Sequence, residues 1–115
     1  MSRRSNDRVA ARPQADASVF AALGDQTRLL LVARLSDGRA YSISQLTAGS
    51  RLTRQAITKH LRVLKHAGMV HSRRTGRERR FEFDPRPIVG MKEYLDRVSE
   101  QWDQALARLK AFVED

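Results

Sequence analysis

The feature that most constrains the fold is a basic, amphipathic segment in the middle of the chain, residues 53–67. Ile57, Leu61 and Leu64 recur there at the spacing of one helical face. The segment starts with a threonine, a suitable N-cap, and a glycine follows its last turn, where helices commonly end in a left-handed residue. The sequence therefore predicts a helix of about four turns with one buried face.

The opposite face of this helix is rich in cationic and hydrogen-bonding side chains. It carries Arg54, Gln55, Thr58, Lys59, Arg62 and Lys65. In a major groove, Arg can pair with guanine and Gln with adenine, while Thr can reach a base or a phosphate. A solvated surface helix would carry a similar face, so the flanking segments must decide between the two interpretations.

The flanking segments favour a DNA-binding unit. Ser42 with Gln45 three residues later is a capping-box pattern that predicts a short helix, and Gly49 and Ser50 lie in the connection to the next helix. Residues 69–74 and 79–84 read as two strands around a turn at 75–78 that contains a glycine. This order predicts a winged helix-turn-helix, a mainly α fold with a small β-hairpin wing.

The charge distribution points to a polyanionic partner. The formal net charge is +9, and residues 51–80 hold ten basic side chains and one acid, so this segment accounts for the whole excess. Residues 86–115 hold five basic and six acidic side chains. The positive charge is therefore a patch on the predicted winged unit.

Composition excludes several classes of function. The chain has no cysteine, which excludes disulfides, thiolate metal sites and thiol redox switches. It has no apolar run near the roughly 20 residues of a membrane span and no signal-peptide core at its start. We expect a cytoplasmic, nucleoid-associated protein with no membrane partner.

The remaining segments complete one domain, which we expect to span residues 15–113. Residues 1–14 are predicted to be a disordered basic tail. Asp25 is expected to cap a helix over 26–36, and the apolar residues expected to be buried in it are Leu29, Leu30, Val32, Ala33 and Leu35.

A long helix, residues 87–113, is predicted to make the chain a homodimer. Its apolar residues alternate at spacings of three and four from Ile88 to Phe112, which is a heptad seam too long for so small a domain to cover. A preceding helix, residues 16–23, is expected to join it. The predicted dimer interface contains Val19, Phe20, Leu23, Met91, Leu95, Val98, Trp102 and Leu109.

Four segments in order resemble the ArsR (ArsR/SmtB) family of bacterial winged-helix regulators. They are residues 20–29 (FAALGDQTRL), 43–46 (ISQL), 52–70 (LTRQAITKHLRVLKHAGMV) and 74–77 (RTGR). The resemblance implies a homodimeric transcriptional repressor that binds an inverted-repeat operator and is released by an inducer.

The chain departs from the metal-sensing branch of that family. Where those members have a Cys-x-Cys pair, this sequence has Ser42 and Ser44, and its C-terminal helix has no histidine. Asp96, Glu100 and Asp103 share a face of that helix, but a solvated face explains them better than a metal site. We expect no metal and no cofactor, and leave open an unidentified small-molecule or protein effector.

The predicted DNA contacts combine the recognition helix, 53–67, with the wing, 73–80. The predicted contact residues are Arg51, Thr53, Arg54, Gln55, Thr58, Lys59, Arg62, Arg73, Arg74, Arg77 and Arg79. Two other readings use the same features: a sequence-tolerant nucleic-acid-binding or architectural protein, and a winged-helix protein-interaction module. No set of side chains in the predicted layout resembles a catalytic site, so we do not expect an enzyme.

Overall fold

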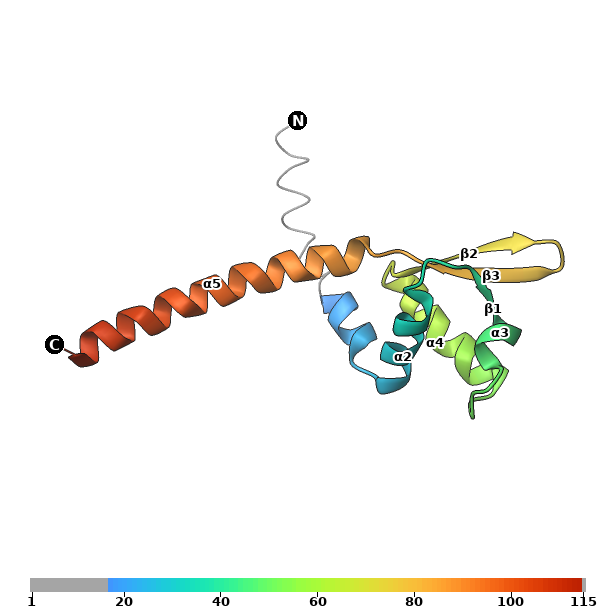
Figure 1. The fold of residues 1–115 in the computed structure, drawn as a ribbon, viewed down its shortest axis with the longest axis horizontal. Helices are drawn as coiled ribbons and strands as arrows, with labels where there is room; N and C mark the ends of the chain where they lie inside the picture. The colour runs from blue at the N-terminus through green and yellow to red at the C-terminus, as the bar shows by residue number, and fades with distance from the viewer. Residues whose placement is uncertain (1–16, 115) are drawn as a thin grey trace, which may run out of the picture.

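The computed structural model describes residues 17–114, so the predicted tail at 1–14 lies outside the described residues. Residues 17–23 are helical and are called the N-terminal helix below. After them come α2 (Gln26–Leu35), β1 (Tyr41–Ser42), α3 (Ile43–Thr47), α4 (Arg54–His66), β2 (Val70–Thr75), β3 (Glu78–Phe83) and α5 (Arg86–Glu114). Figure 1 shows the shorter helices gathered at one end, the hairpin of β2 and β3 beside them, and α5 extending away on the opposite side.

The predicted helix starts are confirmed by their capping contacts. The side chains of Asp25 and Thr53 each accept the backbone N–H of the residue three positions later, at 3.1 Å. Ser42 and Gln45 form the complete capping box at the start of α3. These local contacts satisfy backbone donors that a helix leaves free at its first turn, which is why such starts can be predicted from sequence.

The wing belongs to a three-stranded antiparallel sheet with the order β1-β3-β2. The hairpin turn is the predicted one, with Gly76 at a positive φ of 65° in the first central position, as in type II′ turns. The register pairs Ser72 with Phe81. Strand β1 was not predicted, because two residues are too few to show an alternating pattern.

The core lies between the helices and the sheet. It contains the predicted Ile57, Leu61 and Leu64 of α4, together with Phe81 of β3. The prediction for α2 was partly wrong: Val32 and Leu35 are buried as expected, but Leu31 is buried too, while Leu29, Leu30 and Ala33 are exposed. The apolar run from 29 to 33 does not show which side of the helix faces inward, since every position in it is apolar.

Helix α5 is only partly packed on the rest of the chain. Its first turns pack against the core through Ile88 and Met91, and Tyr94 meets Phe20 edge-on with ring centroids 6.4 Å apart. The helix has 29 residues, a length of about 43 Å. Its second half projects from the domain (Figure 1). The seam residue Trp102 in that half is 64% exposed.

Candidate nucleic-acid interface

The corner between α3 and α4 places the first turn of α4 at the surface. Gly49 has a positive φ of 75°, which the corner requires and which other residues adopt only with strain. The backbone N–H of Ser50 donates to the Thr47 carbonyl at 2.9 Å, and the Ser50 hydroxyl accepts from the backbone N–H of Leu52 at 3.0 Å. The corner is therefore fixed by hydrogen bonds, and α4 starts in a defined direction.

The exposed face of α4 forms a shallow concave surface of about 370 Å³, and its lining is a set of side chains that can bind DNA. The lining residues are Arg54, Gln55, Thr58, Lys59 and Arg62. All five belong to the predicted contact set, and so do Arg51 and Thr53, which are exposed at the start of the helix. The structure thus brings the helical part of the predicted set together on one face.

Two of these side chains are held in place, and the others are available to a partner. Arg54 donates to the Ser44 hydroxyl of α3 at 2.7 Å, and the Thr58 hydroxyl donates to the Arg54 carbonyl at 2.7 Å. Gln55, Lys59 and Arg62 make no side-chain hydrogen bond to another residue within 17–114. The role of Ser44 in orienting Arg54 was not predicted, because their ten-residue separation gives no local signal.

One face of the wing continues the surface of α4. The register and the alternation of strands put Arg74 and Arg79 on the same face as Ser72, whose hydroxyl accepts from both Arg79 and Lys65 of α4 at 3.1 Å. Arg77, at the tip, and Arg79 also line a hollow of about 240 Å³ together with Arg54. These contacts connect the wing to the recognition helix.

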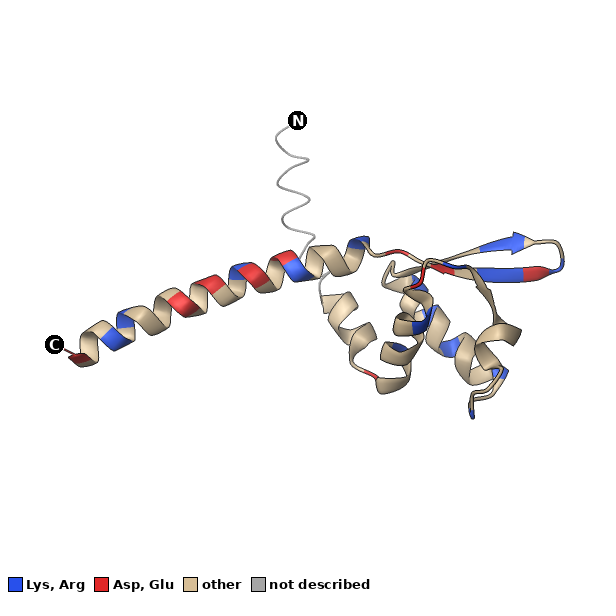
Figure 2. Ribbon diagram, in the orientation of Figure 1, with Lys and Arg blue, Asp and Glu red and all other residues tan. Residues whose placement is uncertain are grey.

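The other face of the wing carries arginines that are paired with acids. Arg73 lies 3.6 Å from Glu82, and Arg80 lies 3.4 Å from Glu78. Arg73 belongs to the predicted contact set, but it lies on the face away from Arg79, and its charge is partly balanced. Figure 2 shows only Lys and Arg among the charged residues of α4, whereas the wing and α5 carry both signs of charge.

Arg28 joins the N-terminal helix to α4 from behind. Its Nε donates to the Ala22 carbonyl at 2.6 Å, and its Nη1 lies 3.3 Å from His60 Nδ1. Because a guanidinium can only donate, this ring nitrogen of His60 is the acceptor. His60 therefore has a structural contact, and it lies on the side of α4 that faces the domain.

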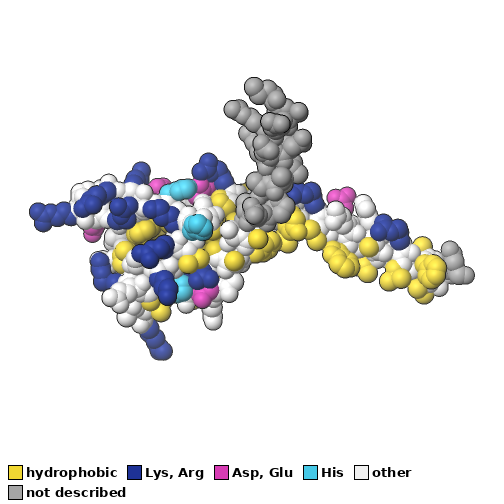
Figure 3. Space-filling model, turned by 180° about the vertical axis from the view of Figure 1, so that it is seen from behind, with side chains coloured by type: hydrophobic (Ala, Val, Ile, Leu, Met, Phe, Trp, Pro, Cys, Tyr) yellow, Lys and Arg dark blue, Asp and Glu magenta, His cyan; other side chains and the backbone are white. Residues whose placement is uncertain are grey.

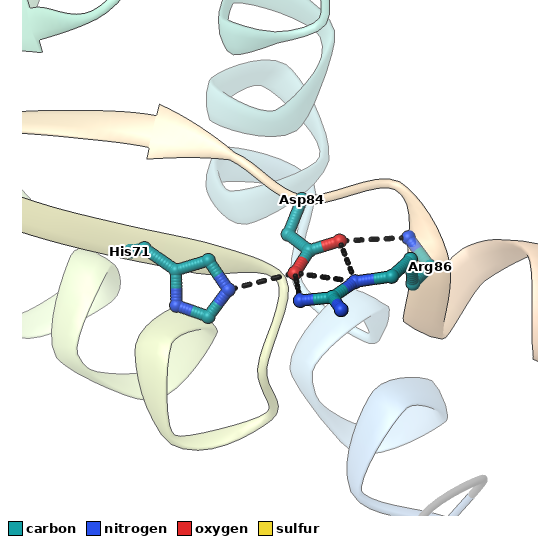
Figure 4. A network of polar contacts seen from close by, with 3 residues as sticks. All are labelled: His71, Asp84 and Arg86. Carbon is teal, nitrogen blue, oxygen red and sulfur yellow. Dashed lines mark hydrogen bonds and ion pairs between the residues drawn. The ribbon is translucent and has the colours of Figure 1, made fainter.

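The junction between the wing and α5 is held by a nearly buried carboxylate, which the sequence did not reveal. Asp84 accepts from Arg86 Nη2 at 2.6 Å and from the Arg86 backbone N–H at 3.0 Å, and it lies 2.7 Å from His71 Nε2 (Figure 4). The hydrogen bond from the Arg86 side chain is the main reason that the pKa of Asp84 lies far below its ordinary value. The network ties the end of β3 to the start of α5.

The predicted dimer residues fall into two groups. Val19 is 3% exposed and belongs to the core of its own protomer, and Leu23 and Met91 pack partly against that core. Phe20, Leu95, Trp102 and Leu109 are 40–64% exposed, and Val98 is half-buried. Figure 3 shows hydrophobic side chains along one side of α5 and basic side chains gathered over the winged end. The free apolar surface therefore lies mainly on α5.

Neither a metal centre nor a membrane segment is found within residues 17–114. In this part of the chain no group of three or more His, Asp or Glu side chains could hold a metal ion. No helix there is long and apolar enough to cross a membrane.

A helix-turn-helix whose exposed face continues onto a basic β-hairpin defines a winged helix-turn-helix, the DNA-binding domain of many transcriptional regulators. Comparisons with known proteins agree. The family model "Bacterial regulatory protein, arsR family" matches residues 25–72. The HTH-type transcriptional regulator YuzN of Bacillus subtilis is 40% identical over 80 residues, which cover 64% of this chain and 87% of YuzN.

Solved structures lead to the same family. An ArsR-like transcriptional regulator from Rhodococcus sp. RHA1 is 37% identical, with a TM-score of 0.77 over 86% of this chain and 92% of that chain. The winged domain of Mb0332 from Mycobacterium bovis, 22% identical, shares the fold with a TM-score of 0.62 over 89% of this chain and 91% of that one. This chain belongs to the arsR family of bacterial regulatory proteins and is a DNA-binding transcriptional regulator, not an enzyme.

Proposed function

We propose that the protein is a homodimeric repressor that binds an inverted-repeat operator, with α4 of each protomer in the major groove and the wing on the backbone or in the minor groove. The observation that carries this proposal is the continuity of one basic surface from α4, through Lys65 and Ser72, to Arg79. Two such surfaces related by two-fold symmetry would read half-sites about 10 base pairs apart, or a multiple of that spacing.

The side chains on α4 divide into base-reading and phosphate-binding groups. Gln55 lies in the first turn and is exposed, as expected of a residue that reaches base edges, whereas Arg62 lies two turns further along. We predict that Gln55→Ala relaxes base preference at one position of each half-site, by about 1–3 kcal/mol of discrimination. Arg62→Ala is expected to weaken binding to all sequences alike and to reduce the salt slope by about 1. Fluorescence anisotropy on a panel of single-base variants measures both effects, and the reverse pattern would show that the assignment of the two residues is wrong.

Dimerisation is supported by the exposed seam of α5. Trp102 and Leu109, both on the seam, are 64% and 58% exposed, and Phe112, further along the seam, is exposed as well. The Mb0332 domain, which shares the fold, is described as homodimeric. A second copy that packs along α5 would cover this surface and set the spacing of the two α4 helices.

Selection of bound duplexes from a random DNA pool, followed by a salt titration of the winning sequence, tests the proposal. The expected result is an enriched inverted repeat that binds roughly 10³-fold or more above random DNA. If no motif is enriched and the affinity for all DNA falls steeply as the salt concentration rises, the protein is a sequence-tolerant DNA binder. If no duplex DNA is bound even at low salt, the repressor proposal is wrong, and the protein is better explained as a winged-helix protein-interaction module.

A further inference from the structure

Beside the exposed basic face of α4 lies a second hollow, of about 480 Å³, which shares only Arg62 with that face. It lies between the N-terminal helix, the start of α2 and the second half of α4. Its lining residues are Ser18, Ala21, Ala22, Arg28, Arg62, Val63, His66 and Ala67. The volume and the largely apolar lining are those of a small-molecule site, in which a few polar groups fix the orientation of the ligand.

The charged groups of this hollow are both cationic. Arg28 and Arg62 supply two guanidinium groups, His66 adds an imidazole, and no acid is among the described residues that line it. Arg28 is held in position, because it donates to the carbonyls of Ala22 and Ala21 at 2.6 and 3.4 Å. Arg62 makes no side-chain hydrogen bond within residues 17–114 and can turn toward a ligand. A neighbouring hollow contains Asp84, so it is less suited to an anion.

We propose that this hollow binds a small carboxylic acid with an apolar body, and that the acid lowers DNA affinity by competing for Arg62. The carboxylate would pair with Arg28 and Arg62, a geometry that guanidinium groups favour, while the apolar body would lie against Ala21 and Val63. Arg62 lines both this hollow and the concave DNA-facing surface of α4. Arg62 would therefore contact the acid in one complex and DNA in the other. This difference in contacts is what coupling between the two sites requires. The effect on DNA rests on the function proposed above, but the binding site does not.

Binding is tested first without DNA, on the full chain, with three probes: benzoate, 2-naphthoate and octanoate. The neutral amide of each probe is the matched control, and acetate at equal concentration controls for ionic strength. In ¹⁵N-HSQC spectra we expect at least one carboxylate to shift the amide signals of Ala21, Val63 and His66, with its amide inactive. If none of the three binds, if the amides bind equally well, or if the shifts lie elsewhere, the site is refuted.

Ala21→Phe fills the hollow from the N-terminal helix, and Ala33→Phe is a control at an exposed alanine of α2 outside the hollow. We expect Ala21→Phe to weaken carboxylate binding at least about tenfold and Ala33→Phe to leave it unchanged. With labelled duplex DNA, the carboxylate should lower the affinity of the wild type by about fivefold or more, and that of Ala21→Phe much less. Carboxylate binding with no effect on DNA affinity would overturn the competition for Arg62. Failure of the wild type to bind DNA would instead count against the proposed function alone.

Discussion

Arg73 and Arg79 lie on adjacent strands of the wing, yet the alternation of the strands sends their side chains to opposite faces. Arg79 lies beside the basic surface of α4, through the Ser72 hydroxyl that it shares with Lys65, whereas Arg73 is paired with Glu82. We therefore predict that Arg79→Ala weakens DNA binding clearly and reduces the salt slope by about 1, while Arg73→Ala has little effect. Anisotropy titrations at several salt concentrations compare the two, and equal losses would mean that both faces of the wing contact DNA.

Asp84 is a nearly buried carboxylate whose pKa is held far below its ordinary value by its hydrogen bonds, so its ionised form stabilises the fold. Asp84→Asn removes the carboxylate that accepts hydrogen bonds from Arg86 and contacts His71. We expect the free energy of unfolding to fall by about 1–2 kcal/mol at pH 5, at the low end for charged hydrogen bonds because the side chains of His71 and Arg86 are both largely exposed. Urea denaturation followed by circular dichroism measures the change. Asp96→Asn, at an exposed site on α5, is the matched control.

The same variant gives a pH prediction with a definite sign. The pKa of Asp84 is lowered by folding, so its contribution to stability is complete above the unfolded-state value of about 4 and declines as the pH falls below it. The difference in unfolding free energy between the wild type and Asp84→Asn should therefore be constant above pH about 5 and shrink toward pH 2.5. A difference that does not change with pH would show that the carboxylate acts only through its shape.

At the scale of elements, a helix could be predicted well from the sequence only where its polar and apolar residues lie on separate faces. Helix α4 could be predicted to its ends, because charged and apolar positions alternate along it and its cap is a local contact. The buried face of α2 could not be identified within the run from Leu29 to Val32. Strand β1 escaped prediction because it exists through its pairing with β3, a contact about 40 residues away in the chain.

Alanine substitutions at two glycines should change the stability of the fold in opposite directions. Gly68 ends α4 with a φ of 79°, and an added Cβ would meet Pro87 only at an ordinary contact distance of 3.6 Å. Gly90 lies inside α5, where an added Cβ meets nothing within 4 Å. Gly68→Ala should therefore cost about 1–2 kcal/mol through backbone strain alone. Gly90→Ala should add about 0.5–1 kcal/mol through helix propensity.

Thermal and urea unfolding at one fixed protein concentration measure both variants, because the stability of the proposed dimer would depend on concentration. Each variant serves as the control for the other, since both add one methyl group. A loss of stability in Gly90→Ala would indicate that the surface of α5 near this position is covered by another part of the assembly.

At the scale of the whole molecule, the sequence predicted which residues share a face of α4 better than it predicted which surfaces are free for assembly. The proposed contact residues on α4 belong to one helix, so no tertiary information was needed to place them together. The proposed interface combines the N-terminal helix with α5. The sequence could not show that Val19 is buried in the core of its own chain, since an apolar residue can pack either in a core or in an interface. Large apolar side chains remain exposed along α5, including Trp102, Leu109 and Phe112 in its second half.

This surface provides the final prediction, that α5 holds two protomers together. Leu109→Asp places a charge on the exposed seam, and Ala107→Asp places the same charge on the opposite side of the helix. Each buried leucine contributes about 2 kcal/mol and occurs twice in a symmetric dimer, so Leu109→Asp should weaken the dimer by about 10²–10⁴-fold. Analytical ultracentrifugation should then find a monomer for Leu109→Asp and a dimer for the wild type and Ala107→Asp.

DNA affinity should follow the oligomeric state, because two linked reading heads bind more tightly than one by about 10²–10⁴-fold. Leu109 belongs to the last turns of α5, and the C-terminal end of that helix lies far from α4 in Figure 1, so the substitution removes none of the proposed DNA contacts directly. A monomeric Leu109→Asp that binds the selected sequence as tightly as the wild type would show that one winged domain is enough. If Leu109→Asp stays dimeric, the interface does not depend on the projecting half of α5, and the N-terminal helix around Phe20 becomes the better candidate.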